Sequence, residues 1–535
     1  MMQPFGLSCK GGLNTNISQF EMLAQPGVAT ILRNFEVDPD GGYRRINGYA
    51  PFGGGSATRP EGTNKILGIY PYALGIVVCV DTSIYYSEDG ITWLQINKDT
   101  GHGGLTEAAL SGASALDRPA QGRAQFALMR NTDDHPTAQY GTLSIATGAN
   151  AVAHFHIDGT GAGRTFTYTE LSTPTNGTYI ENHSRHLCVV DTVNAPSVLY
   201  YSARNDDRDF TGIGSGSVKI NDTITGIKSF RDFLYIFCLN SIWRLENINN
   251  QAALTVVPVT RNVGCISGYS VQEIGGDLLF LAPDGIRTIA GTDRISDVEL
   301  SSVSRQVQQV ISELTSNISS FNVSSVVLRN KSQYRLFYTP PNATSISSAE
   351  GIIGTLTPNG FEWSKIQGIQ APAIVAGFDS NNEEAAYHGD NSGYIYLHDS
   401  GNSFYQEGVA QNIYAIYNTP NLDFGDVGTL KTLHYVKISI SPEGTVQPTL
   451  RIRYNFESTD IPQPPDYVLA SVPLPALFGE ALFGSAVFGA SLDPLVRQAV
   501  QGSGDTCGFR IFSDDTNAPY TINGLYFDYL PSGRR

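Results

Sequence analysis

The chain has 535 residues, of which 50 are acidic and 34 basic, so its formal net charge at pH 7 is −16. Charged residues make up 16% and hydrophobic residues 41% of the chain, which supports sizeable cores and excludes a largely disordered protein. The acidic excess also excludes a protein that grips nucleic acid with a basic surface. The 55 glycines, 27 tyrosines and 25 phenylalanines instead favour a β-rich protein with many tight turns.

The first seven residues contain neither a basic nor an apolar segment, so we expect no secretory signal. No window approaches about 18 uninterrupted apolar residues, so we expect no membrane span and no stable membrane insertion. Six cysteines lie far apart in the sequence: Cys9, Cys79, Cys188, Cys238, Cys265 and Cys507. Several lie within apolar runs, where a thiol packs like a small hydrophobic side chain. We therefore predict reduced, buried cysteines in a protein made in a cytoplasm.

Residues 1–60 precede a series of similar hairpins, and we expect them to form strands that close or flank the structure that follows. In residues 61–404, apolar or aromatic strands alternate with short polar turns, as in residues 75–80 and 84–86 on either side of Asp81. Such hairpins recur roughly every 40–60 residues, a spacing typical of propeller blades. We therefore predict a β-propeller, with six blades expected and five or seven as alternatives. A pair of β-sandwiches would use the same hairpins.

A turn in the first hairpin has the sequence Ser87-Glu88-Asp89-Gly90-Ile91-Thr92-Trp93. It resembles the Asp-box of sialidases and related propellers, S-x-D-x-G-x-T-W, with one residue fewer between the Asp and the Gly. In such a box the Asp accepts hydrogen bonds from backbone N–H groups and the Trp packs between strands. The motif therefore indicates a turn in a propeller and gives no support for glycosidase activity.

One segment has helical rather than strand periodicity. Ser296-Asp297-Val298-Glu299 has the form of a capping box. Apolar residues follow at helical spacing: Leu300, Val303, Val307, Val310, Ile311 and Leu314. We predict one amphipathic helix at about residues 297–314, packed on the outer surface of the propeller or on a neighbouring subunit. Val303, Val307 and Val310 are therefore candidate subunit-interface residues.

Alternating strands predict a C-terminal β-sandwich over residues 405–535, interrupted by an insertion at about 460–505. The insertion contains three Phe-Gly pentapeptides, and aromatic residues five apart fit neither a helix nor a strand, so we expect a series of turns hinged at glycines. Phe478, Phe483 and Phe488 either pack on the chain's own sandwich or dock on another subunit, with membrane insertion as a third alternative. They are further candidate interface residues.

The sequence shows no catalytic or metal-binding constellation. A glycosidase needs two carboxylates at a set separation, and the acidic residues here are the kind that commonly occur in turns. His154 and His156 share one face of a strand, but no cysteine or carboxylate partner for zinc is evident. Asp206, Asp207 and Asp209 lack the glycine and terminal glutamate of an EF-hand. We therefore expect no enzyme activity, no metal and no cofactor.

Three N-terminal stretches occur in the order of a known family pattern: Lys10-Gly11-Gly12-Leu13-Asn14, Leu32-Arg33-Asn34-Phe35 and Gly41-Gly42-Tyr43-Arg44-Arg45-Ile46-Asn47-Gly48-Tyr49. They resemble the opening of tail nozzle proteins of short-tailed bacteriophages, the tail tubular protein B family. In that family a Gly-Gly stretch, an Asn in the first strand and a Gly-x-x-x-Arg-x-Gly turn recur in this order. Residues 264–287 and 422–431 are similar to phage virion proteins of the same kind. The Phe-Gly repeat departs from the family pattern.

The resemblance implies a virion tail protein that is assembled in the cytoplasm of a bacterial host as a homo-hexameric ring at the tail tip. Such a ring attaches to an adaptor protein, carries tail fibre or spike contacts and conducts genomic DNA through its lumen during ejection. Six copies at −16 each would total about −96, and an acidic lumen repels phosphate, so that DNA slides without specific binding. Asp206, Asp207 and Asp209 are candidate residues of that lumen or of an acidic loop.

The function expected from the sequence is therefore that of a structural nozzle protein. The alternative is a carbohydrate-binding or glycan-degrading β-propeller of a virion. A third interpretation, a cell-surface adhesin built of β-repeats, would require the secretion signal that is not expected here.

Overall fold

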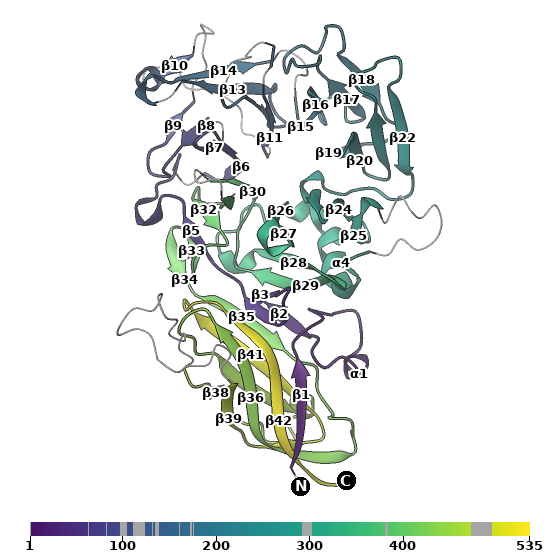
Figure 1. The fold of residues 1–535 in the computed structure, drawn as a ribbon, viewed down its shortest axis with the longest axis vertical. Coiled ribbons are helices and arrows are strands. Elements are labelled where there is room, and N and C mark those ends of the chain that lie inside the picture. Colours follow the sequence, from purple (N-terminus) through teal and green to yellow (C-terminus); the bar gives the residue numbers. More distant parts are fainter. Residues whose placement is uncertain are drawn as a thin grey trace.

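The computed structural model describes residues 2–534 except for 63, 82, 97–103, 111–122, 131, 134–138, 160, 172–173, 175, 291–301, 380–382 and 472–494. Its strands form a ring of β-sheets with a β-sandwich attached at one side (Figure 1). Both ends of the chain lie at the far end of the sandwich. The predicted all-β class, with a propeller, a C-terminal sandwich and a short helix, is confirmed.

Four blades follow one another along the chain, each an antiparallel sheet of four or five strands. They consist of β6 (Ile66–Tyr72), β7 (Gly75–Val80), β8 (Ser83–Ser87) and β9 (Leu94–Gln95); β10 (Leu105–Thr106), β11 (Gln125–Met129), β12 (Thr142–Ala146), β13 (Ala153–Asp158) and β14 (Thr165–Glu170); β15 (Tyr179–His183), β16 (His186–Val190), β17 (Val198–Tyr201) and β18 (Gly216–Lys219); and β19 (Ile224–Phe230), β20 (Phe233–Cys238), β21 (Ile242–Glu246) and β22 (Thr255–Thr260).

The remaining sheets of the ring are a three-stranded sheet and two four-stranded blades. They consist of β23 (Gln272–Ile274), β24 (Asp277–Ala282) and β25 (Gly285–Thr288); β26 (Asn322–Leu328), β27 (Gln333–Thr339), β28 (Glu350–Thr357) and β29 (Gly360–Gln367); and β30 (Ala373–Phe378), β31 (Glu384–Gly389), β32 (Ile395–His398) and β5 (Tyr49–Pro51). The ring of described residues thus contains six blades of four or five strands, the number expected, and β23–β25 occupies a further place between two of them.

The strands in the ring are apolar on both faces because each blade is packed between two neighbours. In β20, Leu234 and Ile236 belong to one hydrophobic core, whereas Tyr235 and Phe237 belong to the next. Since successive side chains of a strand point to opposite faces, both sides of the blade are buried. This packing explains the near-continuous apolar runs that the sequence shows at the hairpins.

The sandwich consists of a seven-stranded sheet facing part of a nine-stranded sheet. The seven strands are β1 (Gln3–Ser8), β3 (Phe35–Val37), β4 (Tyr43–Arg45), β36 (Thr429–Pro442), β39 (Leu495–Ala499), β40 (Ser503–Gly504) and β42 (Tyr520–Arg534). Facing them are β2 (Ile31–Arg33), β35 (Ile413–Asn418), β37 (Thr449–Tyr454), β38 (Tyr467–Val468) and β41 (Cys507–Asp515). Phe509 and Phe527 stack between the two sheets, with ring centroids 4.2 Å apart.

One sheet runs from the propeller into the sandwich. Strand β2 pairs in parallel with β29, with Arg33 opposite Lys365, and antiparallel with β35 on its other side. Strands β26–β29 of the propeller and β35–β41–β37–β38 of the sandwich are therefore one continuous hydrogen-bonded sheet. The N-terminal strands are divided between the two parts of the molecule. Strands β1, β3 and β4 belong to the sandwich, and β5 is the fourth strand of the last blade of the ring.

The remaining elements are short. They are α1 (Gln19–Met22), α2 (Glu107–Leu110), α4 (Gln308–Ser316), the hairpin of β33 (Phe404–Gln406) and β34 (Val409–Gln411), and the 3₁₀ turns η1 (Gly54–Ser56), η2 (Gly161–Gly163), η3 (Gly268–Ser270), η4 (Arg305–Val307), η5 (Ile318–Ser320), η6 (Arg329–Lys331), η7 (Ile346–Ser348) and η8 (Asn455–Glu457). None of the helices among the described residues is long and apolar enough to cross a membrane.

The amphipathic helix is present as α4, which begins at Gln308 after a turn and η4, and residues 297–301 of the predicted span lie outside the described residues. Two of the three candidate subunit-interface residues, Val307 and Val310, do not present their side chains to a partner, and the interface role of Val303 stays a prediction. Val307 and Val310 are buried in the chain's own core, against which Val303 also packs. The indole Nε1 of Trp363 donates a hydrogen bond to the Val303 carbonyl at 2.8 Å, so the apolar stripe of this segment is already covered.

The cysteines are buried as predicted, and none of the six forms a disulfide. Burial raises the pKa of Cys9 to about 12 and that of Cys265 to about 11, so both remain neutral thiols at pH 7. Phe478, Phe483 and Phe488 lie outside the described residues.

Candidate functional site

Two of the N-terminal glycines that carry the family resemblance, Gly12 and Gly48, pack against distant backbone near the place where the propeller meets the sandwich. Gly12 has a φ of +67°, and a Cβ atom there would lie 2.8 Å from the backbone N and O of Trp363 in β29. At Gly48 a Cβ atom would lie 1.9 Å from the carbonyl oxygen of Ser403. Neither position has room for a side chain, so both glycines are required for close packing of two backbones.

The side chain of Asn34, directly after the short strand β2, makes hydrogen bonds to the backbone of two other strands. The residue has a φ of +55°, a conformation that asparagine tolerates better than most residues. Its side chain accepts a hydrogen bond from Gln367 N at 2.9 Å and donates to the carbonyls of Gln367 and Tyr414 at 2.9 and 3.0 Å. The amide therefore links a propeller strand to a sandwich strand.

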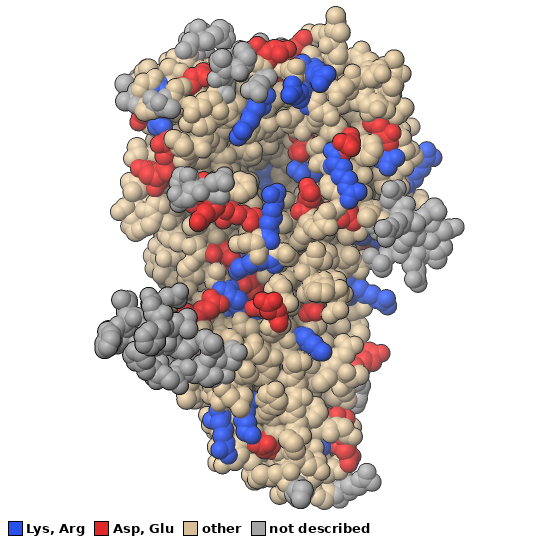
Figure 2. All heavy atoms as spheres, in the orientation of Figure 1, with Lys and Arg blue, Asp and Glu red and all other residues tan. Residues whose placement is uncertain are grey.

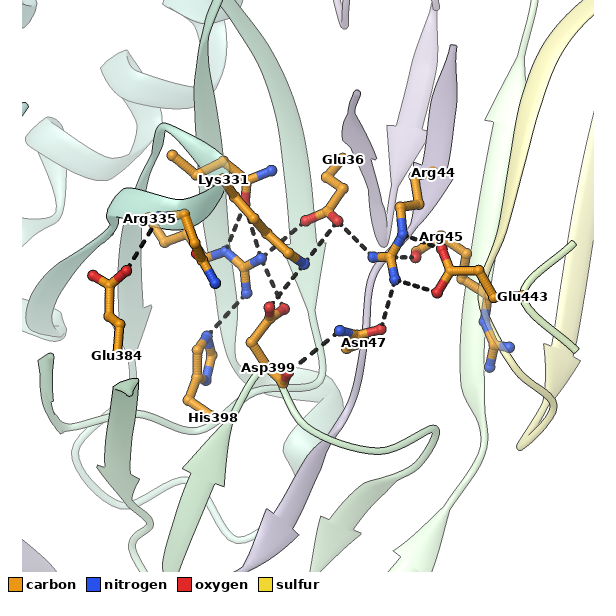
Figure 3. Close-up of polar contacts among 12 residues, drawn as sticks. Glu36, Arg44, Arg45, Asn47, Lys331, Arg335, Glu384, His398, Asp399 and Glu443 are labelled. Atoms are coloured by element: carbon orange, nitrogen blue, oxygen red, sulfur yellow. Dashed lines mark hydrogen bonds and ion pairs between the residues drawn. The ribbon is translucent and has the colours of Figure 1, made fainter. Parts of the chain in front are cut away.

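A buried ion cluster lies beside these residues at the same junction (Figure 3). Glu36 in β3 contacts Arg44, Lys331 and Arg335 at 2.7, 2.9 and 2.9 Å. Asp399, just after β32, contacts Lys331 and Arg335 at 2.7 and 3.0 Å. The Arg335 side chain is fully buried and that of Glu36 nearly so, at 0% and 3% exposure. Five charges from the sandwich and from two blades thus meet in one place.

The cluster is close to electrically balanced. Glu443 adds a third carboxylate by binding the guanidinium of Arg44 at 2.5 and 2.7 Å, so three acids face three bases. Burial raises the pKa of Glu36, but the charges of Lys331, Arg335 and Arg44 outweigh burial and hold that pKa below its ordinary value. Buried charges that are fully paired in this way fix the relative position of the elements that carry them.

Arg45 makes a separate link at the junction. Its buried guanidinium donates to the carbonyls of Asn517 and Asp515 at 2.6 Å each and lies 3.1 Å from the Asp515 carboxylate. The backbone of β4 is thereby attached to the turn between β41 and β42. The residues that carry the resemblance therefore serve architecture in this structure, and the sequence pattern alone gave no indication of their acidic partners.

A cavity of about 390 Å³ lies on the axis of the propeller. Figure 2 shows a hollow near the centre of the ring. Residues from β6, β11, β15, β19, β23, β26 and β30 line it, and its charged lining residues are Arg123, Glu181, Lys228, Glu273, Arg329 and Glu384. Its volume lies in the range of about 300–1,000 Å³ that is typical of small-molecule sites.

A second cavity, of about 440 Å³, lies between the first and last blades and has several carboxylates in its lining. Four of these carboxylates already have partners: Glu88 pairs with Arg164, and Asp379 accepts a hydrogen bond from the backbone N of Glu383 at 2.8 Å. Glu384 accepts hydrogen bonds from the backbone N of Arg329 and of Asn330, both at 3.1 Å, and Asp399 belongs to the ion cluster. These groups therefore serve the fold.

Asp206, Asp207 and Asp209, expected in an acidic lumen or loop, occupy the loop between β17 and β18, and Asp207 is buried, so it cannot line a lumen. Its side chain is fully buried and contacts His154 Nδ1 at 3.0 Å. Asp206 accepts from the backbone N of Asp209 at 3.0 Å, and Asp209 accepts from Gly212 N at 2.7 Å. Three similar residues thus have different roles, because one is directed into the core and two stabilise the turn.

The predicted turn role of the Asp-box-like segment is confirmed. Asp89 Oδ1 accepts hydrogen bonds from the backbone N of Ile91 and Thr92 at 2.9 and 2.8 Å. Ser87 Oγ accepts from Gly90 N at 2.9 Å. These bonds satisfy the turn's own backbone donors, so the segment is a structural turn.

Ser144, His154 and Asp207 lie together but lack the geometry of a catalytic triad. Both Ser144 Oγ, at 3.1 Å, and Asp207 Oδ2, at 3.0 Å, contact the same ring nitrogen, Nδ1. A triad requires the serine and the aspartate on opposite ring nitrogens, and here all three side chains are buried. Within the described part of the chain, no group of three or more His, Cys, Asp or Glu side chains is placed to hold a metal.

No protein-family model and no curated protein matches the chain. Among solved structures it is similar to the extracellular domain of the hybrid two-component system BT4673 from B. thetaiotaomicron. That match has 12% identity and a TM-score of 0.37, and covers 66% of this chain and 39% of the other. A second match is the AfRom2 CNH domain, with 12% identity and a TM-score of 0.34, covering 64% of this chain and 97% of that domain.

Proposed function

We propose that the chain is a structural subunit of the tail nozzle of a short-tailed bacteriophage and has no enzymatic activity. The observation that carries the proposal is the position of the family-like N-terminal residues. Gly12, Asn34, Arg44, Arg45 and Gly48 all lie at the junction of propeller and sandwich. A pattern of residues that specifies this junction is expected of proteins that share the two-part architecture.

The mechanical properties of the junction also support a structural role. The propeller and the sandwich share one continuous sheet, and a balanced, buried ion cluster lies beside it. Relative movement of the two parts would break strand pairing and expose unpaired charges, both of which are costly. Such a subunit would transmit force along the tail without hinging.

The axial cavity of a single propeller does not suit the DNA path of such a nozzle, because it has the volume of a small-molecule site. In the proposed hexamer, DNA would instead pass between copies that are arranged head to tail around a common axis. The net charge of −16 per copy would keep the wall of that passage repulsive to phosphate. An adaptor protein above and fibres or spikes at the sides are the expected partners.

The experiment that tests the proposal is measurement of the assembly state. Mass photometry of the purified chain, alone and with the adaptor of the same phage, should show six copies of 57.8 kDa each, about 350 kDa, and negative-stain images should show rings. The rings should not retain duplex DNA in a filter assay at low salt. A strictly monomeric protein under both conditions, or hydrolysis of a glycan substrate, would contradict the proposal.

A further inference from the structure

The axial cavity of the propeller has two different ends. At one end lie Phe378, the last residue of the inner strand β30, and Arg329, which directly follows the inner strand β26. The Phe378 side chain is 57% exposed. At the other end lies Arg123, just before β11, and its Nη1 donates to the carbonyl of the buried Val323 near the start of β26. Tyr269 of η3 joins Arg123 there. We call the end with Phe378 and Arg329 the mouth, and Arg123 and Tyr269 the floor.

Three of the other charged lining residues have partners within the chain, whereas Arg329 and Glu273 are exposed to solvent. Lys228 contacts the Glu181 carboxylate at 3.3 Å, and Glu384 accepts hydrogen bonds from two backbone N–H groups. These groups need no ligand to satisfy them.

Arg123 on the floor is different, because it is a cation without an acidic partner. Its guanidinium carbon lies 3.7 Å from the centroid of the Tyr269 ring, and Nη1 donates to the carbonyl of Val323. Its Nε is inaccessible to solvent and has no hydrogen-bond partner, and no carboxylate contacts the guanidinium among the described residues. Burial lowers the pKa of Arg123, which reflects the cost of holding this charge away from water.

We propose that the floor of the axial cavity binds the anionic group of a small organic ligand, a carboxylate or a phosphate ester on a body the size of one sugar ring. Arg123 supplies the positive charge, and with Nε inaccessible its remaining N–H donors are those of Nη2 and the second N–H of Nη1, a planar fork that matches both kinds of anion. The Tyr269 ring holds one face of the guanidinium, which fixes the fork before the ligand arrives. An arriving anion would neutralise the half-buried charge.

The cavity also provides for the rest of such a ligand. Its volume of about 390 Å³ suits a ring with a few polar substituents. Gln125, Gln272 and Tyr70 are among the lining residues. Gln125 Oε1 accepts from Ile180 N and Gln272 Nε2 donates to Ser325, so Gln125 Nε2, Gln272 Oε1 and the Tyr70 hydroxyl are the groups that could bind ligand hydroxyls. The site is independent of the nozzle proposal because every residue in it belongs to one chain.

The test is isothermal titration calorimetry of the whole chain with three probes of similar size: D-glucuronate, glucose 6-phosphate and neutral glucose. At least one charged probe should bind ten-fold or more tightly than glucose, and the two charged probes distinguish a carboxylate from a phosphate ligand. Arg123→Gln should weaken that binding ten-fold or more. Arg123→Lys keeps the charge without the fork and should weaken it about three-fold or more.

The chain offers a matched control in Arg59. It lies over the Tyr394 ring at 4.8 Å and donates to the Ser392 carbonyl at 3.3 Å, so it makes the same kinds of contact outside this cavity. Arg59→Gln should leave binding unchanged. Circular dichroism confirms that each variant is folded, and if Arg123→Gln fails to fold, Arg123→Lys decides. Equal binding of charged and neutral probes, no binding by 10 mM, or unchanged binding by folded Arg123 variants would overturn the proposal.

Discussion

Two arginines in two regions of the molecule, Arg335 fully buried and Arg123 half-buried, show how the partners of the same side chain decide its role. At the junction, Arg335 donates to Glu36 and Asp399 at 2.9 and 3.0 Å. In the axial cavity, Arg123 has an aromatic ring and one carbonyl as partners. A buried cation with two carboxylates contributes to the architecture, whereas a cation without one has unused capacity to bind an anion. Three predictions test this comparison.

The largest effect is expected at the junction. Arg335→Met removes the cation between Glu36 and Asp399 and leaves two buried carboxylates with too few partners, so the free energy of unfolding in urea should fall by about 3–5 kcal/mol. The control is Arg451→Met, which breaks an exposed pair with Asp466 and should cost less than about 1 kcal/mol. Equal effects of the two substitutions would remove the distinction between buried and exposed pairs.

The second prediction concerns acid. The cations of the cluster hold the pKa of Glu36 and of Asp399 below their ordinary values despite burial. Groups with a lowered folded pKa stabilise the protein above their unfolded pKa of about 4, and that contribution is lost as the pH falls through the folded pKa. The free energy of unfolding should therefore decrease below about pH 4, as measured by urea titrations at successive pH values. Glu36→Gln should make this decrease smaller, and an unchanged acid dependence would contradict the role of the cluster.

The smallest effect is expected in the axial cavity. Arg123→Gln without ligand removes an unpaired, half-buried charge, so the free energy of unfolding should change by less than about 1 kcal/mol or increase. Urea unfolding of Arg123→Gln and Arg335→Met under the same conditions compares the two changes in the free energy of unfolding. A loss of 3 kcal/mol or more, on the order of a broken buried pair, would show that Arg123 is a structural residue like Arg335.

The features that the sequence predicted correctly depend on neighbours along the chain. Asp89 accepts hydrogen bonds from backbone N–H groups two and three residues away, so the turn is predictable from the sequence of residues 87–93 alone. The same holds for the apolar spacing of Val307, Val310 and Leu314, which indicates a helical segment with one buried face. Spacing does not indicate what covers that face, and the covering surface belongs to this chain rather than to a neighbour.

The candidate site could not be predicted in this way. Asp206, Asp207 and Asp209 are alike in sequence, and only the direction of the folded loop places Asp207 against His154. Arg123 follows a polar stretch and has no motif around it. Its position on the floor depends on Tyr269 and Val323, 146 and 200 residues further along the chain.

The sequence by itself determined the β class, the hairpins, the turns and the burial of the cysteines, because these features follow from local hydrogen bonds and from the periodicity of apolar side chains. The tertiary structure alone decided how the first 60 residues are shared between propeller and sandwich, since β1 pairs with β42 more than 500 residues away, with Gln3 opposite Tyr529. It also decided that Glu36 meets Lys331, Arg335 and Asp399. Contacts of this range depend on how whole sheets pack, and no local pattern encodes them.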